Sequence, residues 1–289
     1  MTRAFADSDK KYYEACNEPG SLIKLKYNSK TYNEENRDIA KEVLVYLPYN
    51  YDKTEESYNV FYLMHGGGGD CNEVFGGMEA KTELKNILDN MIYYGDIKPL
   101  IVAAPSFYYE GTEEAKTIQS AAGLLTQNFH HEFVNDLIPL IEREVRAKTG
   151  REHRAFGGYS MGSEATWNIF ARCLKQVKYF MPMSGDCWAI QVQGGKLCPR
   201  ETADYLKNAA QESGIEKDDF CIYQLVGDNG VAYEAVDTMI KEMMGNDDIF
   251  KFSDSFENGN IIYTVAEGGT HSYEYCYKYI YNALPLFFK

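Results

Sequence analysis

The segment 158–162 reads G-Y-S-M-G and follows the pattern G-x-S-x-G, which places a serine at the apex of a tight turn between a strand and a helix. Residues 153–156 before it can extend as a strand, and residues 163–174 after it carry apolar side chains at helical spacing. The flanking glycines suit this turn, because Cβ atoms beside a strained serine would collide with the helix that starts there. The pattern and its context together predict that Ser160 is a catalytic nucleophile.

A serine hydroxyl needs a base to take its proton, and imidazole, with an ordinary pKa of about 6.5, is the natural base at neutral pH. Three of the five histidines fall on a predicted helix or just before the strand of the serine, which leaves His65 and His271. His271 follows the last predicted strand in a Gly-Gly-Thr-His loop, and it gives the chain order serine, acid, histidine that is typical of α/β hydrolases. We therefore expect His271 to be the base and His65 to buttress the loop that it opens.

An acid must orient the histidine and stabilise its protonated form. Asp228 stands in the turn after the penultimate predicted strand, which is the usual place for this acid. Asp186 follows the strand before that one and is the alternative. Either aspartate could instead only cap its own turn, which is a common role. The residues thus predict Asp228 as the acid and leave Asp186 open.

A buried strand is predicted at 60–64, and it runs directly into His65 and four glycines at 66–69. Four glycines in a row are costly in chain entropy, so a backbone that must approach a ligand closely is favoured over a plain turn. Such a loop supplies one backbone N–H to the oxyanion hole of hydrolases that carry a serine elbow. We expect the two donors to be the N–H groups of Gly67 and Met161.

Strands alternate with helices along most of the chain, which predicts an α/β fold with a mostly parallel sheet covered by helices on both faces. An antiparallel hairpin is expected at 20–47, because apolar residues recur there with a period of two. Further strands are predicted at 60–64, 100–104, 153–156, 179–183, 220–226 and 261–265, and helices at 80–93, 129–148, 163–174, 202–213, 233–244 and 273–282. Pro139 should kink the helix 129–148, and Gly150 should stop it. The candidate site residues all lie just beyond strand ends, where the loops of such folds form the site.

The chain has 289 residues, of which 45% are hydrophobic, and we expect one domain over 1–289 with residues 1–20 as an N-terminal extension. The formal net charge of -14 argues against binding to nucleic acid or to an anionic membrane. No apolar run approaches the length of a membrane span, and residues 1–10 are too polar for a signal peptide. Seven scattered cysteines show no metal-site spacing, so no metal site is expected.

From about residue 42 to residue 288 the sequence resembles the feruloyl esterases of carbohydrate esterase family 1. The resemblance rests on several motifs taken together: LMHGGG (63–68), HEFV (131–134), GGYSMG (157–162), YFMP (179–182), SGD with Trp188 (184–186), GTH (269–271) and YIYNALP (279–285). It implies an α/β-hydrolase fold, with Ser160 as nucleophile, His271 as base and Met161 and Gly67 as oxyanion donors. It also suggests that Asp186 and Trp188 line the acyl pocket, and His65 is a further candidate for contact with the substrate.

One position departs from the family. The acid of these enzymes usually stands three residues after the glycine that ends the penultimate strand, and here that register places Gly230 where the aspartate is expected. Asp228 is two positions early. A rearranged turn could still direct Asp228 toward His271, and otherwise Asp186 could serve from the neighbouring loop.

The resemblance implies a secreted or wall-associated ester hydrolase that releases ferulic or p-coumaric acid from arabinoxylan through an acyl-enzyme, without a cofactor. Its partners would be feruloylated arabinoxylan or small hydroxycinnamate esters, together with other modules of a larger enzyme that degrades plant cell walls. One alternative is an acetyl-xylan or general carboxylesterase on the same scaffold. A second alternative, of another class, is a hydrolase-fold binding protein with an impaired triad, which the displaced acid would support.

Overall fold

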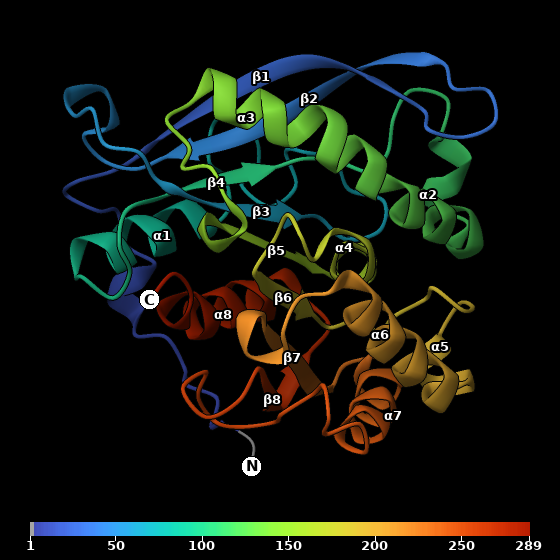
Figure 1. Ribbon diagram of the computed structural model, residues 1–289. Coiled ribbons are helices and arrows are strands. Elements are labelled where there is room, and N and C mark those ends of the chain that lie inside the picture. Colours follow the sequence, from blue (N-terminus) through green and yellow to red (C-terminus); the bar gives the residue numbers. More distant parts are fainter. Residues whose placement is uncertain (1–2) are drawn as a thin grey trace.

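The computed structural model describes residues 3–289, and its centre is an eight-stranded sheet (Figure 1). The strands follow the order β1-β2-β4-β3-β5-β6-β7-β8 across the sheet. Their bounds are β1 (Ser21–Lys30), β2 (Asp38–Leu47), β3 (Asn59–Met64), β4 (Leu100–Ala104), β5 (Arg154–Tyr159), β6 (Tyr179–Met183), β7 (Cys221–Asn229) and β8 (Ile261–Thr270). β1 and β2 pair antiparallel, as does β2 with β4, and the other neighbours pair parallel. The predicted α/β-hydrolase fold with an antiparallel N-terminal hairpin is confirmed.

Helices cover both faces of the sheet (Figure 1). α1 (Leu84–Tyr93) and α8 (Tyr273–Ala283) pack on one face, and α2 (Gln119–Glu132), α3 (Ile138–Glu144), α4 (Met161–Cys173), α6 (Pro199–Ser213) and α7 (Tyr233–Met244) pack on the other. A single-turn helix, α5 (Gly194–Leu197), precedes α6. Successive side chains of β3 enter opposite cores: Tyr62 faces the side of α4 and Phe61 faces the side of α8. Burial on both faces explains why this strand is apolar throughout.

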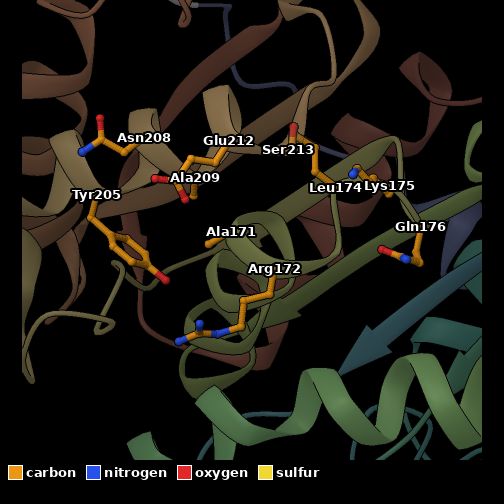
Figure 2. A pocket seen from close by; sticks show the side chains of 10 residues that line it. All are labelled: Ala171, Arg172, Leu174, Lys175, Gln176, Tyr205, Asn208, Ala209, Glu212 and Ser213. Atoms are coloured by element: carbon orange, nitrogen blue, oxygen red, sulfur yellow. The ribbon is translucent and has the colours of Figure 1, made fainter.

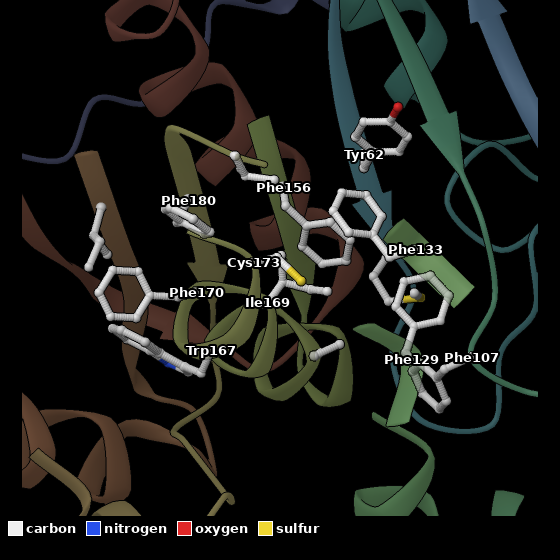
Figure 3. Packing of buried hydrophobic residues seen from close by; sticks show 14 of the residues in the cluster. Tyr62, Phe107, Phe129, Phe133, Phe156, Trp167, Ile169, Phe170, Cys173 and Phe180 are labelled. Carbon is white, nitrogen blue, oxygen red and sulfur yellow. The ribbon is translucent and has the colours of Figure 1, made fainter. Parts of the chain in front are cut away.

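Aromatic side chains fill the core between the central strands and the helices of the α4 face (Figure 3). Phe133 meets Tyr62 and Phe156 edge to face, with ring centroids 5.0 Å and 5.2 Å apart. Phe170 of α4 packs in the same manner on Phe180 of β6, at 5.2 Å. Such contacts add stability beyond the apolar area that they bury. They hold α4 against the sheet and thereby fix the turn from which this helix starts.

The helix predicted at 129–148 differs from the observed one. It begins ten residues earlier, at the start of α2, and a π-helical turn, Phe133–Leu137, separates α2 from α3. Pro139 follows this turn after one residue, at the start of α3, and its missing N–H interrupts the regular hydrogen-bond ladder where the kink is predicted. The predicted stop at Gly150 was wrong, because the backbone becomes extended at Val145.

β7 and β8 run further than predicted and include residues expected in loops, up to Asn229 and Thr270. Glycines permit this close pairing, since a Cβ on Gly227 would lie 2.2 Å from the carbonyl oxygen of Gly269. The pairing register shifts between Gly227 and Asn229, which marks a bulge. His271 therefore comes directly after Thr270, the last residue of β8, which is paired with β7.

The N-terminal extension is anchored to the body of the protein by polar contacts. The side-chain amide of Asn90 donates to the carbonyl oxygens of Tyr12 and Glu14, and the Tyr12 hydroxyl donates to Asp96 at 2.6 Å. All seven cysteines are free thiols, five of them buried. Within residues 3–289, no helix is both long and apolar enough to cross a membrane, and no three His, Cys, Asp or Glu side chains gather as metal ligands would.

Candidate active site

Ser160 lies at the sharp turn between β5 and α4, and its φ of 55° is a strained value for a residue with a side chain. The backbone packs so closely around this turn that the glycines on either side have no room for a Cβ. A Cβ on Gly158 would lie 2.4 Å from the carbonyl oxygen of Gly162, and one on Gly162 would lie 2.5 Å from the carbonyl oxygen of Met64. The predicted strand, turn and helix are therefore present, with each flanking glycine sterically required.

His271 meets the serine from the end of β8. Its Nε2 lies 2.9 Å from the Oγ of Ser160, within hydrogen-bond distance. Its ring packs on Tyr159, with centroids 4.8 Å apart. Burial lowers the pKa of His271 below its ordinary value, because the site disfavours the charged form. A neutral imidazole beside the hydroxyl is the protonation state that a general base needs.

The other ring nitrogen of His271 has no partner. Nδ1 is buried and makes no hydrogen bond to any residue in 3–289. Asp228 is exposed, and its carboxylate accepts the backbone N–H of Gly268 at 2.7 Å. Asp186 is buried and accepts from the Nε1 of Trp188 at 2.9 Å and from the N–H of Gly195 at 2.7 Å. The structure thus brings neither predicted acid to the histidine; both carboxylates are held by other donors.

Gly230 stands beside His271, at the position where the family pattern expects the aspartate. A Cβ built there would lie 3.3 Å from the backbone nitrogen of His271 and 3.6 Å from its Cβ. The φ of Gly230 is outside the left-handed region, but the same Cβ would also lie 3.2 Å from the carbonyl oxygen of Gly227, so the neighbouring backbone would have to shift slightly to accept a side chain. The turn has therefore not rearranged to present Asp228; the neighbouring position is simply a glycine.

The glycine loop after β3 packs against the first residue of α4. A Cβ on Gly67 would lie 3.2 Å from the side chain of Met161, so the two segments are in close contact. Tyrosine hydroxyls accept the N–H groups on either side, that of Gly66 at 3.0 Å and that of Gly68 at 3.2 Å. Within the described residues, no acceptor takes the N–H of Gly67. Met161, at a helix N-terminus, lines the cavity beside Ser160, whereas Gly67 contacts Met161 without lining that cavity, so its role as the second donor stays a prediction.

His65 lies behind the glycine loop, almost fully buried. Its Nδ1 donates to the carbonyl oxygen of Gly66 at 2.6 Å, and its Nε2 accepts from the hydroxyl of Ser106 at 2.7 Å. Burial lowers the pKa of His65 to about 4, so the ring is neutral. The side chain supports the loop as expected, and the predicted contact with substrate is not evident, because His65 does not line the cavity beside Ser160.

A cavity of about 410 Å³ opens at the serine and the histidine. Asp186 and Trp188 lie along it, as the resemblance implies. The full lining consists of Gln119, Ser160, Met161, Glu164, Ser184, Gly185, Asp186, Trp188, Gln193, Lys196, Val231, Ala232, Glu234, Ala235 and His271. This volume suits a small organic group.

Glu164 is a cavity residue that the sequence interpretation missed. It follows Ser160 by four residues, and this spacing on one helix face was the signal that could have identified it. Its side chain is 3% exposed, and burial raises the pKa of the carboxyl well above its ordinary value. Glu164 is thus a buried acid in the wall of the candidate site.

A larger hollow of about 540 Å³ lies elsewhere, between the end of α4 and α6 (Figure 2). Arg172 and Tyr205 are among its lining residues, and no histidine is. Volume alone would not have selected the cavity beside Ser160, because this hollow and another of about 610 Å³ are both larger. The chemistry selects the cavity beside Ser160.

Comparison with known proteins places this arrangement among esterases. The Esterase family model matches residues 35–275. The chain is 35% identical over 287 residues to endo-1,4-beta-xylanase Y of Acetivibrio thermocellus and 32% identical over 178 residues to an endo-1,4-beta-xylanase/feruloyl esterase of Xylanibacter ruminicola. The first match covers 96% of this chain and the second 60%. The chain spans only 24% and 22% of the length of these two relatives.

Solved structures resemble the chain over nearly its whole length. A serine-to-alanine mutant of the feruloyl esterase module of Clostridium thermocellum, in complex with sinapinate, is 32% identical and superposes with a TM-score of 0.84, covering 99% of this chain and 94% of the module. A ferulic acid esterase of Anaeromyces mucronatus, in complex with ferulic acid, is 18% identical with a TM-score of 0.71, covering 97% and 96% of the two chains. The second likeness supports the fold alone.

Proposed function

This chain belongs to the Esterase family, and we propose that it is a serine feruloyl esterase that releases hydroxycinnamic acids, such as ferulic and p-coumaric acid, from the xylan of plant cell walls. The observation that carries the proposal is the likeness, at 32% identity over 99% of this chain, to a feruloyl esterase module whose structure holds sinapinate. Sinapinate is itself a hydroxycinnamate. The hydrogen bond between Ser160 and His271 supports the same chemistry.

In the acylation half of the reaction, the Oγ of Ser160 attacks the ester carbonyl carbon while Nε2 of His271 takes the hydroxyl proton. The N–H groups of Gly67 and Met161 then stabilise the negative charge that develops on the carbonyl oxygen. When the tetrahedral intermediate collapses, the protonated His271 gives its proton to the sugar oxygen, and the alcohol leaves. The acyl group remains on Ser160 as an ester.

In the second half, water attacks the acyl-enzyme. His271, neutral again, takes a proton from the water, and the same two N–H groups stabilise the second tetrahedral intermediate. Collapse returns the proton to Ser160 and frees the carboxylic acid. Each half uses the residues in one geometry, so no movement of the fold and no cofactor is needed for this sequence of steps.

The cavity favours an aromatic acyl group over an acetyl group. Trp188, with its ring nitrogen bound to Asp186, offers a fixed aromatic surface along a space of about 410 Å³. An acetyl group would leave most of this space unfilled, and filling it is where binding energy for the transition state arises. The acetyl-xylan alternative is therefore not favoured, nor is a binding protein, because His271 already contacts the serine.

The test compares the release of acid from methyl ferulate, methyl p-coumarate and feruloylated arabinoxylan with release from acetylated xylan and p-nitrophenyl acetate. We expect kcat/KM for the hydroxycinnamates to exceed that for the acetyl esters by at least about tenfold, with no turnover by Ser160→Ala. Preference for acetyl esters would move the function to the alternative. Absence of any turnover, together with no labelling of Ser160 by a fluorophosphonate, would indicate a binding protein.

We further propose that the protein acts outside the cell and is one module of a larger enzyme. Its proposed substrate is an insoluble extracellular polymer, and the chain spans about a quarter of the xylanases that it matches. Neighbouring modules that cleave or bind xylan would keep the esterase near its substrate by raising the effective concentration. Assay of culture supernatant and cell fractions for Ser160-dependent activity tests this location.

A further inference from the structure

Glu164 is a buried acid whose place in the cavity suggests a function that the catalytic steps above do not use. It lines the cavity, its side chain is 3% exposed, and its Oε2 has no hydrogen-bond partner in residues 3–289. Four residues of α-helix rise about 6 Å, so its backbone lies one turn below Ser160. Helical side chains lean toward the N-terminus of their helix, which directs this carboxyl back toward the serine.

Within residues 3–289, the groups around Glu164 include a second carboxylate, and no cation pairs with Glu164. Asp186 lies near enough to raise the pKa of Glu164, in addition to the larger effect of burial. Two donors already hold Asp186, the Nε1 of Trp188 and the N–H of Gly195. The cavity lysine, Lys196, is paired with Glu234 at 2.6 Å. Burial raises the pKa of both carboxyls, but the two donors oppose this effect at Asp186 alone, so Asp186 is better able to carry the charge and the surroundings of Glu164 favour its protonated form.

We propose that Glu164 determines specificity: its neutral carboxyl group donates a hydrogen bond to an oxygen substituent on the aromatic ring of the acyl group. The carboxyl of Glu164 lines the same cavity as the ring of Trp188, where the aromatic ring of the acyl group would lie. An acyl group with a ring oxygen would satisfy the unpaired donor, and one without it would leave that donor buried and unpaired, which is costly. This inference rests on the proposed feruloyl esterase function.

The closing experiment measures one ratio, kcat/KM for methyl ferulate divided by kcat/KM for methyl cinnamate, which lacks ring oxygens. A ratio taken within one variant is independent of the fraction of protein that folds. We expect Glu164→Leu, which removes the donor but fills the space, to lower the ratio at least about tenfold. Glu164→Gln keeps an N–H donor and should hold the ratio within about threefold of wild type.

Asn168→Leu is the matched control. Asn168 lies one turn further along α4, is also buried with an unpaired side-chain oxygen, and does not line the cavity. Its substitution should change stability but not the ratio. An unchanged ratio in Glu164→Leu would overturn the proposal, as would a loss in Glu164→Gln equal to that in Glu164→Leu.

Methyl 3,4-dimethoxycinnamate separates donation by Glu164 from acceptance, because its ring oxygens can accept a hydrogen bond but cannot donate one. If Glu164 donates, the wild-type enzyme should still prefer this ester to methyl cinnamate. Loss of the preference would mean that Glu164 is ionised and accepts a hydrogen bond from the phenolic hydroxyl, which would overturn the proposal. If the wild-type enzyme instead hydrolyses acetyl esters and no hydroxycinnamate ester, the proposed function itself is refuted, and the role of Glu164 with it. Wild-type turnover of methyl ferulate with an unchanged ratio in Glu164→Leu refutes the role of Glu164 alone.

Discussion

The surroundings of Ser160, here called the serine side, fix their residue more completely than the surroundings of His271, the histidine side. Around Ser160, backbone atoms pack so closely that a Cβ on either flanking glycine would clash, and the loop of Gly67 lies against Met161. Around His271, one nitrogen contacts the serine, but Nδ1 is buried and finds no hydrogen-bond partner in the described part of the chain. The serine side is sterically defined, whereas the histidine side lacks its usual electrostatic support.

This difference shows that nucleophile geometry and base orientation are separable features of the fold. The serine turn follows from local sequence and from the central strands beneath it. The orientation of His271 depends instead on packing against Tyr159 and on the hydrogen bond to Ser160. A pair held in this way can still perform general base catalysis, but the imidazolium that forms in the reaction gains no stabilisation from a neighbouring carboxylate.

The largest expected effect comes from removing either member of the pair. Ser160→Ala and His271→Ala should each lower kcat by about 10⁴-fold, since the two residues act as a unit. The double variant should lose no more than either single one. Steady-state kinetics on methyl ferulate, with circular dichroism to check folding, measures this. Retention of more than a few per cent of activity in either variant would remove that residue from its assigned role.

The glycine loop gives the next largest effect and tests the well-packed side. A side chain on Gly67 would press on Met161, 3.2 Å from the built Cβ, and displace one oxyanion donor. Gly67→Val should therefore lower kcat by at least about 10²-fold, the scale for loss of one donor. A normal kcat with a raised KM would mean that the loop only shapes the cavity. Gly68→Ala, at a loop position with a φ of 78° where the new Cβ would touch only the carbonyl oxygen of Lys116 at 3.9 Å, controls for general disturbance of the loop.

Local patterns predicted the serine side well. The turn at Ser160, the preceding buried strand and the glycine loop each depend on residues adjacent in sequence, and the central strands lie within a few residues of their expected bounds. The predicted base also proved correct in position, because His271 follows the last strand directly. These features are set by backbone sterics and by apolar runs, which are readable without knowledge of tertiary contacts.

The parts that failed depend on contacts between distant segments. Whether Asp228 reaches His271 is decided by the bulge and the extended pairing of β7 with β8, which no local pattern reveals. The pairing leaves Asp228 beside the turn at Gly268 and places Gly230 beside the histidine. Glu164 was missed for a related reason: a glutamate on a helix is ordinarily exposed, and only the packed structure buries it.

Supplying a carboxylate on the histidine side should reduce the contrast between the two sides. Gly230→Asp places a side chain next to His271, and the turn must shift slightly to accept it, because the carbonyl oxygen of Gly227 would lie 3.2 Å from the new Cβ. A hydrogen bond to a charged group contributes about 1.5–3 kcal/mol, which corresponds to roughly 10- to 100-fold in kcat at about 1.4 kcal/mol per tenfold. Gly230→Asn is the matched control and should give little or none of this gain. A fall in kcat with intact folding would mean that the packing of His271 is already optimal.

The pH dependence sharpens the same comparison. His271 must be neutral to take the serine proton, and burial lowers its pKa, so kcat/KM of wild type should fall only below the ordinary imidazole range of about pH 6.5. A carboxylate at position 230 would favour the imidazolium and raise this pKa. The acidic limb of Gly230→Asp should therefore move to higher pH while the plateau rises. A limb at the same pH in both proteins would show that the new carboxylate does not reach the ring.

The smallest effect is expected at Asp228, which the sequence favours as the acid. In a working triad, replacing the acid with asparagine leaves the shape but costs about 10⁴-fold in kcat, because the histidine loses its partner. Here the Asp228 carboxylate is exposed and accepts the N–H of Gly268 at 2.7 Å, a bond that an asparagine oxygen can also make. Asp228→Asn should consequently change kcat by less than about threefold, since exposed substitutions of this kind alter free energies by only about 0.5 kcal/mol. A collapse of kcat for every ester, with folding intact, would show that the turn rearranges during catalysis to bring Asp228 to Nδ1. The histidine side would then be completed only in the reacting enzyme, and Gly230→Asp would bring no gain.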